Sequence, residues 1–151
     1  MLISPLSVYS NNLEFFTADI SCIMPLPFVG TGISAGFPSP AEEYIDLSLD
    51  LNRELVTNPS STFYGRVKGS SMKDAGVLDG DVLVIDKSLQ PKSGQIAVCY
   101  LDGEFTIKYI KITANRCFLI PANDQFPTIE VSEDNDFRIW GIVTYVIKKM
   151  A

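Results

Sequence analysis

A serine and a lysine are the residues of this sequence whose types and surroundings point to chemistry. Histidine is absent from the 151 residues, which excludes a Ser-His-Asp or Cys-His nucleophilic site and any histidine-ligated metal centre. A nucleophilic side chain would therefore need a lysine or a carboxylate as its base. The three cysteines, Cys22, Cys99 and Cys117, are widely spaced and include no C-x-x-C pair. We expect reduced thiols, no metal site and no cofactor.

The candidate serine lies in the stretch Gly69-Ser70-Ser71-Met72. This stretch follows an apolar segment, Phe63 to Val67, and precedes a second turn at Leu78-Asp79-Gly80-Asp81. A serine on a glycine-flanked turn after a strand can expose its hydroxyl beside free backbone N–H groups, which an oxyanion site requires. An ordinary turn without chemistry is the alternative that this motif alone leaves open.

The candidate base is Lys108, inside the segment Phe105 to Ile110. In a strand, its side chain shares a face with Thr106 and Ile110. A solvent-facing lysine on an amphipathic strand is one interpretation. The other is a lysine desolvated by apolar neighbours, because burial can lower its pKa from about 10.4 by roughly 3–5 units. Such an amine is a competent general base at neutral pH.

The elements that must position these residues divide into an arm and a β domain. Residues 1–40 contain five of the nine prolines and two charged residues, Glu14 and Asp19, with scattered apolar side chains. We expect this part to be an extended N-terminal arm lying against apolar surface. Ser39-Pro40-Ala41-Glu42 has the spacing of a capping box and predicts a short helix containing Tyr44, Ile45 and Leu49. Asp50 could cap a second turn that ends before Pro59.

From residue 61 onward the pattern predicts six or seven strands. No alternation of strands and helices appears, so the fold class is mainly β, a compact, curved, antiparallel sheet domain over residues 41–151. Asp102-Gly103 predicts the turn of a hairpin. The segments expected as strands are Phe63–Val67, Val82–Ile85, Ile96–Tyr100, Phe105–Ile112, Cys117–Ile120, Thr128–Val131 and Phe137–Val146.

Four blocks of sequence, in order, resemble the LexA/UmuD family of self-cleaving serine peptidases, and its UmuD branch most closely. The similarity spans roughly Gly36 to Lys149. The blocks are the cleavage-type segment Ala35-Gly36-Phe37-Pro38-Ser39-Pro40; the loop Gly69-Ser70-Ser71-Met72 with Asp79-Gly80-Asp81; the strand Asp102 to Lys108; and Leu119-Ile120-Pro121-Ala122-Asn123 with Trp140-Gly141-Ile142-Val143.

This resemblance implies a β domain like the C-terminal domain of LexA and assigns roles to particular residues. Ser71, directly before Met72, would be the nucleophile, and Lys108 its base. The bond cut would be Ala35-Gly36, with the backbone amides of Ser71 and Met72 stabilising the oxyanion. Ser70 stands where the UmuD branch tends to carry aspartate. Tyr109 replaces a basic residue often found after the catalytic lysine.

The resemblance also implies a place in the response to DNA damage. A RecA–single-stranded-DNA filament would promote self-cleavage, and the processed homodimer would join a UmuC-type subunit in an error-prone translesion polymerase. About 35 residues precede Ala35, too few for the DNA-reading module of LexA-like repressors. The formal charge of −6 also disfavours direct DNA binding.

Two other classes of protein remain open at this stage. One is a signal-peptidase-like Ser/Lys peptidase that acts in trans, and the other is a non-catalytic regulator of the same fold. No apolar stretch of about 18 residues and no signal peptide is evident, so we expect a cytoplasmic protein without a membrane anchor.

Overall fold

The computed structural model describes residues 5–10, 13–21, 25–29 and 45–151. It groups them into two compact units, Met1–Asp19 with Asn58–Ala151, and Ile20–Thr57. The sequence predicts a single division after residue 40. The structure divides the chain differently, because strands from the predicted arm pair with strands in both units. No helix in the described part of the chain is long and apolar enough to cross a membrane.

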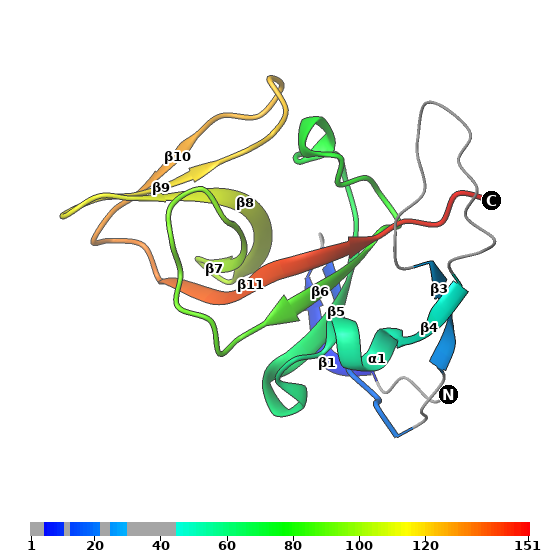
Figure 1. Cartoon of the computed structure of the whole chain (residues 1–151). Helices are drawn as coiled ribbons and strands as arrows, with labels where there is room; N and C mark the ends of the chain where they lie inside the picture. Colours follow the sequence, from blue (N-terminus) through cyan, green and yellow to red (C-terminus); the bar gives the residue numbers. More distant parts are fainter. Residues whose placement is uncertain (1–4, 11–12, 22–24, 30–44) are drawn as a thin grey trace. The chain divides into compact units, whose positions relative to one another are not determined.

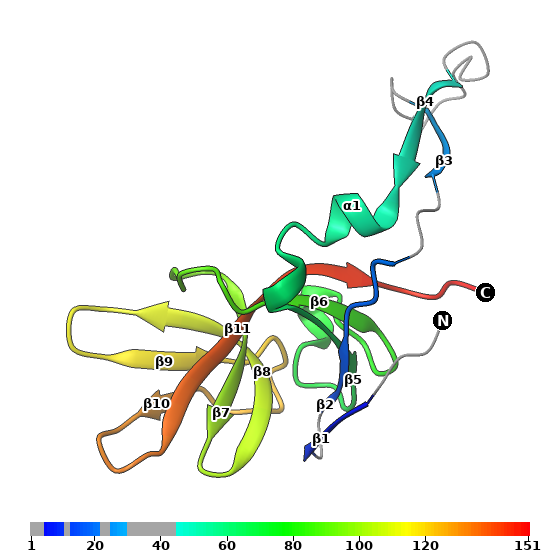
Figure 2. The same ribbon diagram turned by 90° about the horizontal axis from the view of Figure 1, so that it is seen from below.

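The first unit is built on one antiparallel sheet, which confirms the predicted fold class (Figure 1). Within the described residues, the order of its nine strands is β1-β2-β5-β6-β11-β7-β8-β9-β10. β11 therefore lies in the middle, and Figure 2 shows the strands fanning out around it. The strands are β1 Pro5–Ser10, β2 Leu13–Thr17, β5 Thr62–Val67, β6 Val82–Asp86, β7 Ile96–Leu101, β8 Glu104–Ile112, β9 Cys117–Ile120, β10 Ile129–Val131 and β11 Phe137–Ile147.

The strands predicted from residue 61 onward are confirmed, with ends that shift by at most one residue. The hairpin turn between β7 and β8 also forms as predicted. Asp102 and Gly103 both have positive φ, 48° and 91°, as the favoured two-residue hairpin turn requires. This turn fixes the register in which Lys108 faces Ala97 across the pair.

The predicted arm supplies strands that the sequence analysis missed, and two of them, β1 and β2, belong to the first unit. β2 pairs with β5 over five residues, from Leu13 opposite Val67 to Thr17 opposite Phe63. β1 pairs with the other side of β2. Because Leu13 and Phe15 alternate with Glu14 and are buried, β2 presents one apolar face to the core. The residues before Asp19 are thus part of the sheet rather than an arm laid over it.

The second unit contains the hairpin of β3, Pro25–Val29, and β4, Ile45–Asp50. The predicted helix through Ile45 and Leu49 is therefore wrong in that part, and its expected start at residues 39–44 lies outside the described residues. The predicted second turn is confirmed as α1, Leu51–Leu55, since the carboxylate of Asp50 accepts a hydrogen bond from the Asn52 amide.

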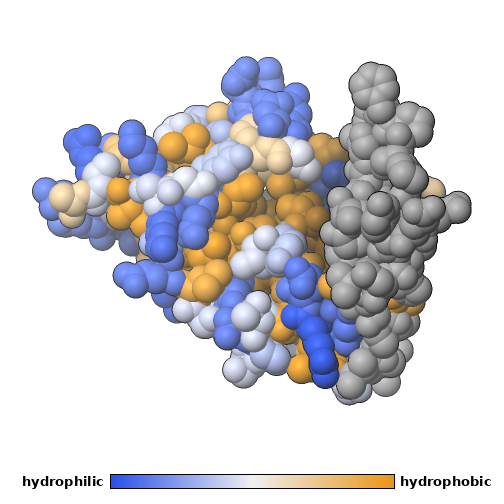
Figure 3. Space-filling model, viewed as in Figure 1, coloured by the Kyte–Doolittle hydropathy of each residue, from blue (hydrophilic) through white to orange (hydrophobic). Residues whose placement is uncertain are grey.

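The core of the first unit consists of two apolar clusters that take alternate residues of β7, Val98 in one and Ala97 with Cys99 in the other. One gathers residues from β2, β5, β6, β7 and β8, and the other gathers residues from β7, β8, β9 and β11. On the face seen in Figure 3, hydrophobic residues gather over the middle of the sheet and hydrophilic residues surround them. The two 3₁₀ turns, η2 Pro59–Ser61 and η3 Lys73–Ala75, flank β5 and the loop that follows it.

Candidate active site

The loop that carries Ser71 runs from the end of β5 to η3. Its entry is fixed by the Asp79 carboxylate, which accepts a hydrogen bond from the Gly69 amide at 2.9 Å. Gly69 has φ 94°, a conformation that a residue with a Cβ rarely adopts. The Gly80 amide also donates to the Val67 carbonyl at 2.8 Å. These two hydrogen bonds connect the end of β5 and the turn at residues 69–72 to the turn at residues 78–81, so each turn holds the other in place.

The exit of the loop is held by the segment after β9, a contact that the sequence analysis did not foresee. The Ala122 amide donates to the Ser71 carbonyl at 2.9 Å. The side-chain amide of Asn123 donates to the Ser70 carbonyl at 2.8 Å, and its oxygen accepts from the Gln125 amide at 2.9 Å. Asn123 is only 6% exposed, so these bonds are shielded from water. The bonds to the Ser70 and Ser71 carbonyls fix the two peptide units that flank Ser71.

Lys108 extends from the middle of β8 and is 6% exposed, which excludes a solvent-facing lysine. Its Nζ lies 3.0 Å from the Ser71 Oγ, 2.8 Å from the Thr106 Oγ1 and 3.0 Å from the Ile107 carbonyl oxygen. Thr106 was expected on the same face, but the sequence analysis gave it no role. The structure thus brings Ser71 and Lys108 together, 37 residues apart in the sequence.

Burial lowers the pKa of Lys108, because the charged ammonium loses its hydration there. Among the described residues, Lys108 forms no ion pair with a carboxylate. The nearby Cys99 thiol has its pKa raised to about 12, first by burial and then by Cys117. Since that thiol keeps its proton at neutral pH, it supplies no negative charge that would hold a proton on Lys108.

The three neighbours of Nζ match the hydrogen-bonding capacity of a neutral amine. A neutral amine has two hydrogens and one lone pair. The Thr106 hydroxyl and the Ile107 carbonyl can accept the two hydrogens. The lone pair is then directed at the Ser71 hydroxyl, which can donate its proton to it. This arrangement is chemically able to take a proton from Ser71 without histidine.

The oxyanion site expected at the serine depends on two backbone amides. Among the described residues, the N–H groups of neither Ser71 nor Met72 donate to any acceptor. The neighbouring Lys73 amide, by contrast, donates to the Ser70 carbonyl. Free N–H groups beside a nucleophile stabilise the negative charge of a tetrahedral intermediate.

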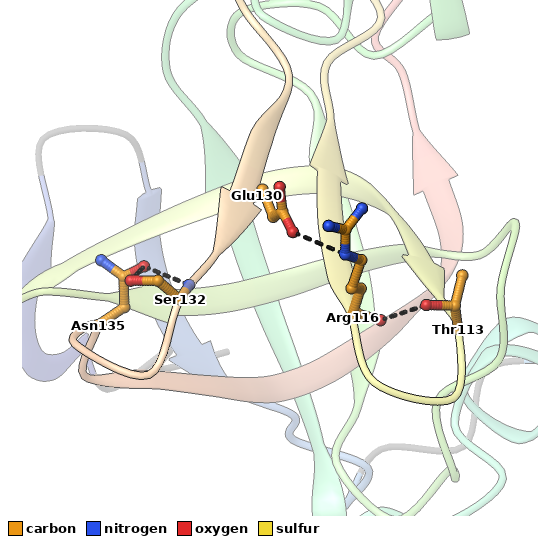
Figure 4. A network of polar contacts seen from close by, with 5 residues as sticks. All are labelled: Thr113, Arg116, Glu130, Ser132 and Asn135. Atoms are coloured by element: carbon orange, nitrogen blue, oxygen red, sulfur yellow. Dashed lines mark hydrogen bonds and ion pairs between the residues drawn. The ribbon is translucent and has the colours of Figure 1, made fainter.

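The dyad opens into a cleft of about 270 Å³. Phe126, Pro127 and Ile129 form one wall of the cleft, and much of the Phe126 side chain is exposed. Figure 4 shows polar contacts on β9, β10 and their turns, made by residues that do not line the cleft: the Glu130 carboxylate pairs with Arg116 at 3.2 Å, and Asn135 accepts from the Ser132 amide in the turn after β10. The cleft is lined by Val67, Lys68, Gly69, Ser70, Ser71, Met72, Leu101, Glu104, Thr106, Ile107, Lys108, Phe126, Pro127 and Ile129.

Ala35 and Gly36, the residues expected at the cleaved bond, lie outside the described residues. Cys99 and Cys117 are free thiols. In the part of the chain that the structure describes, no three His, Cys, Asp or Glu side chains gather in a way that could hold a metal ion.

Comparison with known proteins identifies a family and several relatives of this chain. Residues 27–144 match the family model described as Peptidase S24-like, a range that includes both Ser71 and Lys108. Protein MucA of Salmonella typhimurium is 42% identical over 132 residues, which cover 87% of this chain and 90% of MucA. Protein SamA of Salmonella typhimurium strain LT2 is 42% identical over 115 residues, or 76% of this chain and 79% of SamA. The LexA repressor of Ectopseudomonas mendocina is 37% identical over 125 residues, or 82% of this chain and 60% of that repressor.

Proposed function

Because this chain belongs to the Peptidase S24-like family of self-cleaving serine peptidases and is a UmuD-like SOS mutagenesis protein within it, we propose that Ser71 and Lys108 form a catalytic dyad that cuts the Ala35-Gly36 bond of the same protein. The observation that carries this proposal is the 3.0 Å contact between the Lys108 Nζ and the Ser71 Oγ, made by an amine whose pKa is lowered by burial.

In the first step, neutral Lys108 accepts the proton of Ser71 while the Oγ attacks the Ala35 carbonyl carbon. The carbonyl oxygen becomes an oxyanion, to which the amides of Ser71 and Met72 donate. Lys108, now protonated, gives its proton to the nitrogen of Gly36 as the peptide bond breaks. A water molecule then attacks the acyl-serine and gives one proton to Lys108, and Lys108 passes that proton to the Ser71 Oγ as the ester bond breaks.

The products are residues 1–35 with a free carboxylate and residues 36–151 with a free amine. Ala35 and Gly36 suit this reaction, because a nucleophile recessed beside a buried lysine admits small side chains most readily. The net result is the hydrolysis of one peptide bond, with one water consumed and no cofactor required.

The cellular setting is proposed from the UmuD-like relatives. A RecA–single-stranded-DNA filament would promote the cut in the cytoplasm. The processed homodimer would then serve a UmuC-type subunit of an error-prone translesion polymerase. The net charge of −6 supports protein partners over direct contact with DNA.

The test is intact-mass spectrometry of the purified protein held at pH about 7 and about 10. Wild type should yield two fragments split between Ala35 and Gly36, faster at the higher pH. Ser71→Ala and Lys108→Ala should yield none. Ser70→Ala is the matched control: its hydroxyl is exposed and does not contact Lys108 among the described residues, so cleavage should persist.

Two results would contradict this assignment. Fragments that persist in Ser71→Ala would move the nucleophile away from Ser71. A wild type that stays intact at both pH values, with and without RecA filament, would favour the non-catalytic regulator. Efficient cutting of added peptides by a chain that remains intact would identify instead a peptidase acting in trans.

A further inference from the structure

The part of the chain before the proposed cut contributes strands to both units of the structure. β2 is hydrogen-bonded to β5, and β3 is hydrogen-bonded to β4. The Ala35-Gly36 bond falls in the sequence between β3 and β4. Its scission therefore breaks one covalent connection but leaves both strand pairs intact. We infer that residues 1–35 remain bound after cleavage, so that the processed form is a nicked protein of two chains. This inference rests on the proposed cleavage site.

The strongest attachment is the apolar face of β2. Leu13 is 0% exposed and Phe15 is 2% exposed, and both belong to the main core cluster. All the other buried members of that cluster lie after the cut: Val67, Met72, Val77, Leu83, Ile85, Val98 and Ile107. Departure of residues 1–35 would therefore open the core itself to water, because two of its fully buried side chains would leave with the fragment.

The ring of Phe15 also belongs to a group of aromatic side chains. Its centroid lies 4.7 Å from that of Trp140 and 4.9 Å from that of Phe105, in tilted and edge-on arrangements. These are favourable geometries for aromatic pairs. Both partner rings come from strands on the far side of the cut, β11 and β8. The contacts of Phe15 thus extend to strands on both sides of β7.

Strand pairing adds a second reason for retention. Without β2, the N–H and C=O groups along one side of β5 would have no partner, leaving an unprotected sheet edge. The apolar surface that Leu13 and Phe15 now cover would also be exposed to water beside that edge. The ion pair between Glu14 and Lys68, at 2.7 Å, adds little because both side chains are substantially exposed. The fragment is therefore held by the apolar contacts of Leu13 and Phe15 and by the backbone hydrogen bonds between β2 and β5.

The experiment must separate retention from the ability of the protein to cut itself. It therefore uses a Ser71→Ala chain with the recognition sequence of a site-specific protease inserted between Ala35 and Gly36. After complete cutting, denaturing mass spectrometry should show two chains. Size-exclusion chromatography and native mass spectrometry at micromolar concentration should show both chains in one species. Recovery of residues 36–151 alone under native conditions would overturn the inference, whatever the wild type does on its own.

Two neighbouring phenylalanines provide a matched pair of variants. Phe15→Ala removes a ring from the core and should raise the dissociation constant of the fragment by about 100-fold or more. Phe16→Ala removes the same atoms from the opposite, half-buried face of β2 and should have a much smaller effect. Equal effects of the two substitutions would contradict anchoring through the core. Trp140 fluorescence of each uncut variant checks that it folds, and the cut Ser71→Ala chain decides the inference without either variant.

Discussion

At the scale of single residues, the proposed role of Lys108 as base predicts how cleavage depends on pH. Only the neutral amine accepts the proton of Ser71, and burial lowers its pKa. The first-order rate of cleavage should therefore rise with pH up to the lowered pKa and then level off, below the 10.5 that is usual for lysine. Lys108→Arg keeps the charge but cannot lose its proton. It should not cleave at any pH up to about 10, as measured by intact mass. A rate that falls with rising pH would contradict the role of Lys108 as base.

The same burial makes the stability of the fold depend on pH. Between the lowered pKa of the folded state and 10.5 in the unfolded state, the unfolded chain binds a proton that the folded chain does not. The free energy of unfolding should therefore rise with pH across this window. Lys108→Met removes this dependence. In urea unfolding, the free energy of unfolding of Lys108→Met minus that of wild type should be greatest near neutral pH and should fall toward pH 10.5. A difference that does not change with pH would show that Lys108 titrates normally.

Asn123 should support catalysis without touching the substrate. Asn123→Ala leaves the Ser70 carbonyl and the Gln125 amide without their side-chain partner, at a cost of about 0.5–1.5 kcal/mol of stability. Because the loop can then shift, cleavage at pH 10 should slow roughly 10- to 100-fold. Asn123→Asp retains an acceptor for Gln125 but loses the donor to Ser70. It should slow cleavage with a smaller loss of stability. Wild-type rates in both variants would show that the Ser71 loop holds its geometry unaided.

The sequence could indicate Ser71 and Lys108 because each belongs to a local motif. It could also place Thr106 on the face of Lys108, since strand side chains alternate. It could not indicate Asn123, whose bond to Ser70 joins residues 53 positions apart. Contacts of that kind depend on how β8, β9 and the Ser71 loop meet in space, and no spacing within a motif encodes them.

At the scale of elements, the alternation of apolar and polar residues that is typical of a strand is present in β4 and in β2, but the sequence analysis did not predict either strand. Ile45, Leu47 and Leu49 alternate with Asp46, Ser48 and Asp50, a two-residue period typical of a strand. The capping-box spacing at Ser39 and the near-helical spacing of Tyr44, Ile45 and Leu49 favoured a helix instead. β2 is also short, with one clear alternation around Glu14. Short segments of this kind take their structure from the strand they pair with, which a single sequence does not show.

At Gly141, in the middle of β11, the neighbouring strand β6 approaches too closely to leave room for a side chain. A Cβ at Gly141 would lie 2.6 Å from the Ile85 Cγ2 on β6, at the irregularity where β11 changes its register with β7. Gly141→Ala should therefore cost about 1–3 kcal/mol through overpacking, seen as a lower urea midpoint. Gly141→Ala combined with Ile85→Val should recover part of the loss. A single variant as stable as wild type would show that Ile85 moves aside without cost.

At the scale of the whole molecule, residues before the proposed cut stabilise the fold of residues after it. In the uncut chain, Phe15→Ala should lower the free energy of unfolding by about 3–5 kcal/mol. Trp140, the single tryptophan, lies against Phe15 and reports the transition through its fluorescence. Phe16→Ala should lower it less, since Phe16 lies outside the core clusters. Equal losses would indicate that β2 contributes through pairing alone.

The central place of β11 has a consequence for the timing of biosynthesis. Ser71 follows β5 and Lys108 lies on β8, and β11 is the strand between the β5–β6 and β7–β8 pairs. Among the described strands, β11 comes last in the sequence. Until it is made, the β5–β6 and β7–β8 pairs lack the strand that lies between them, although Ala122 and Asn123 can already bond to the Ser71 loop. If Ser71 and Lys108 form the proposed dyad, self-cleavage should therefore be slower in a nascent chain than in the finished protein.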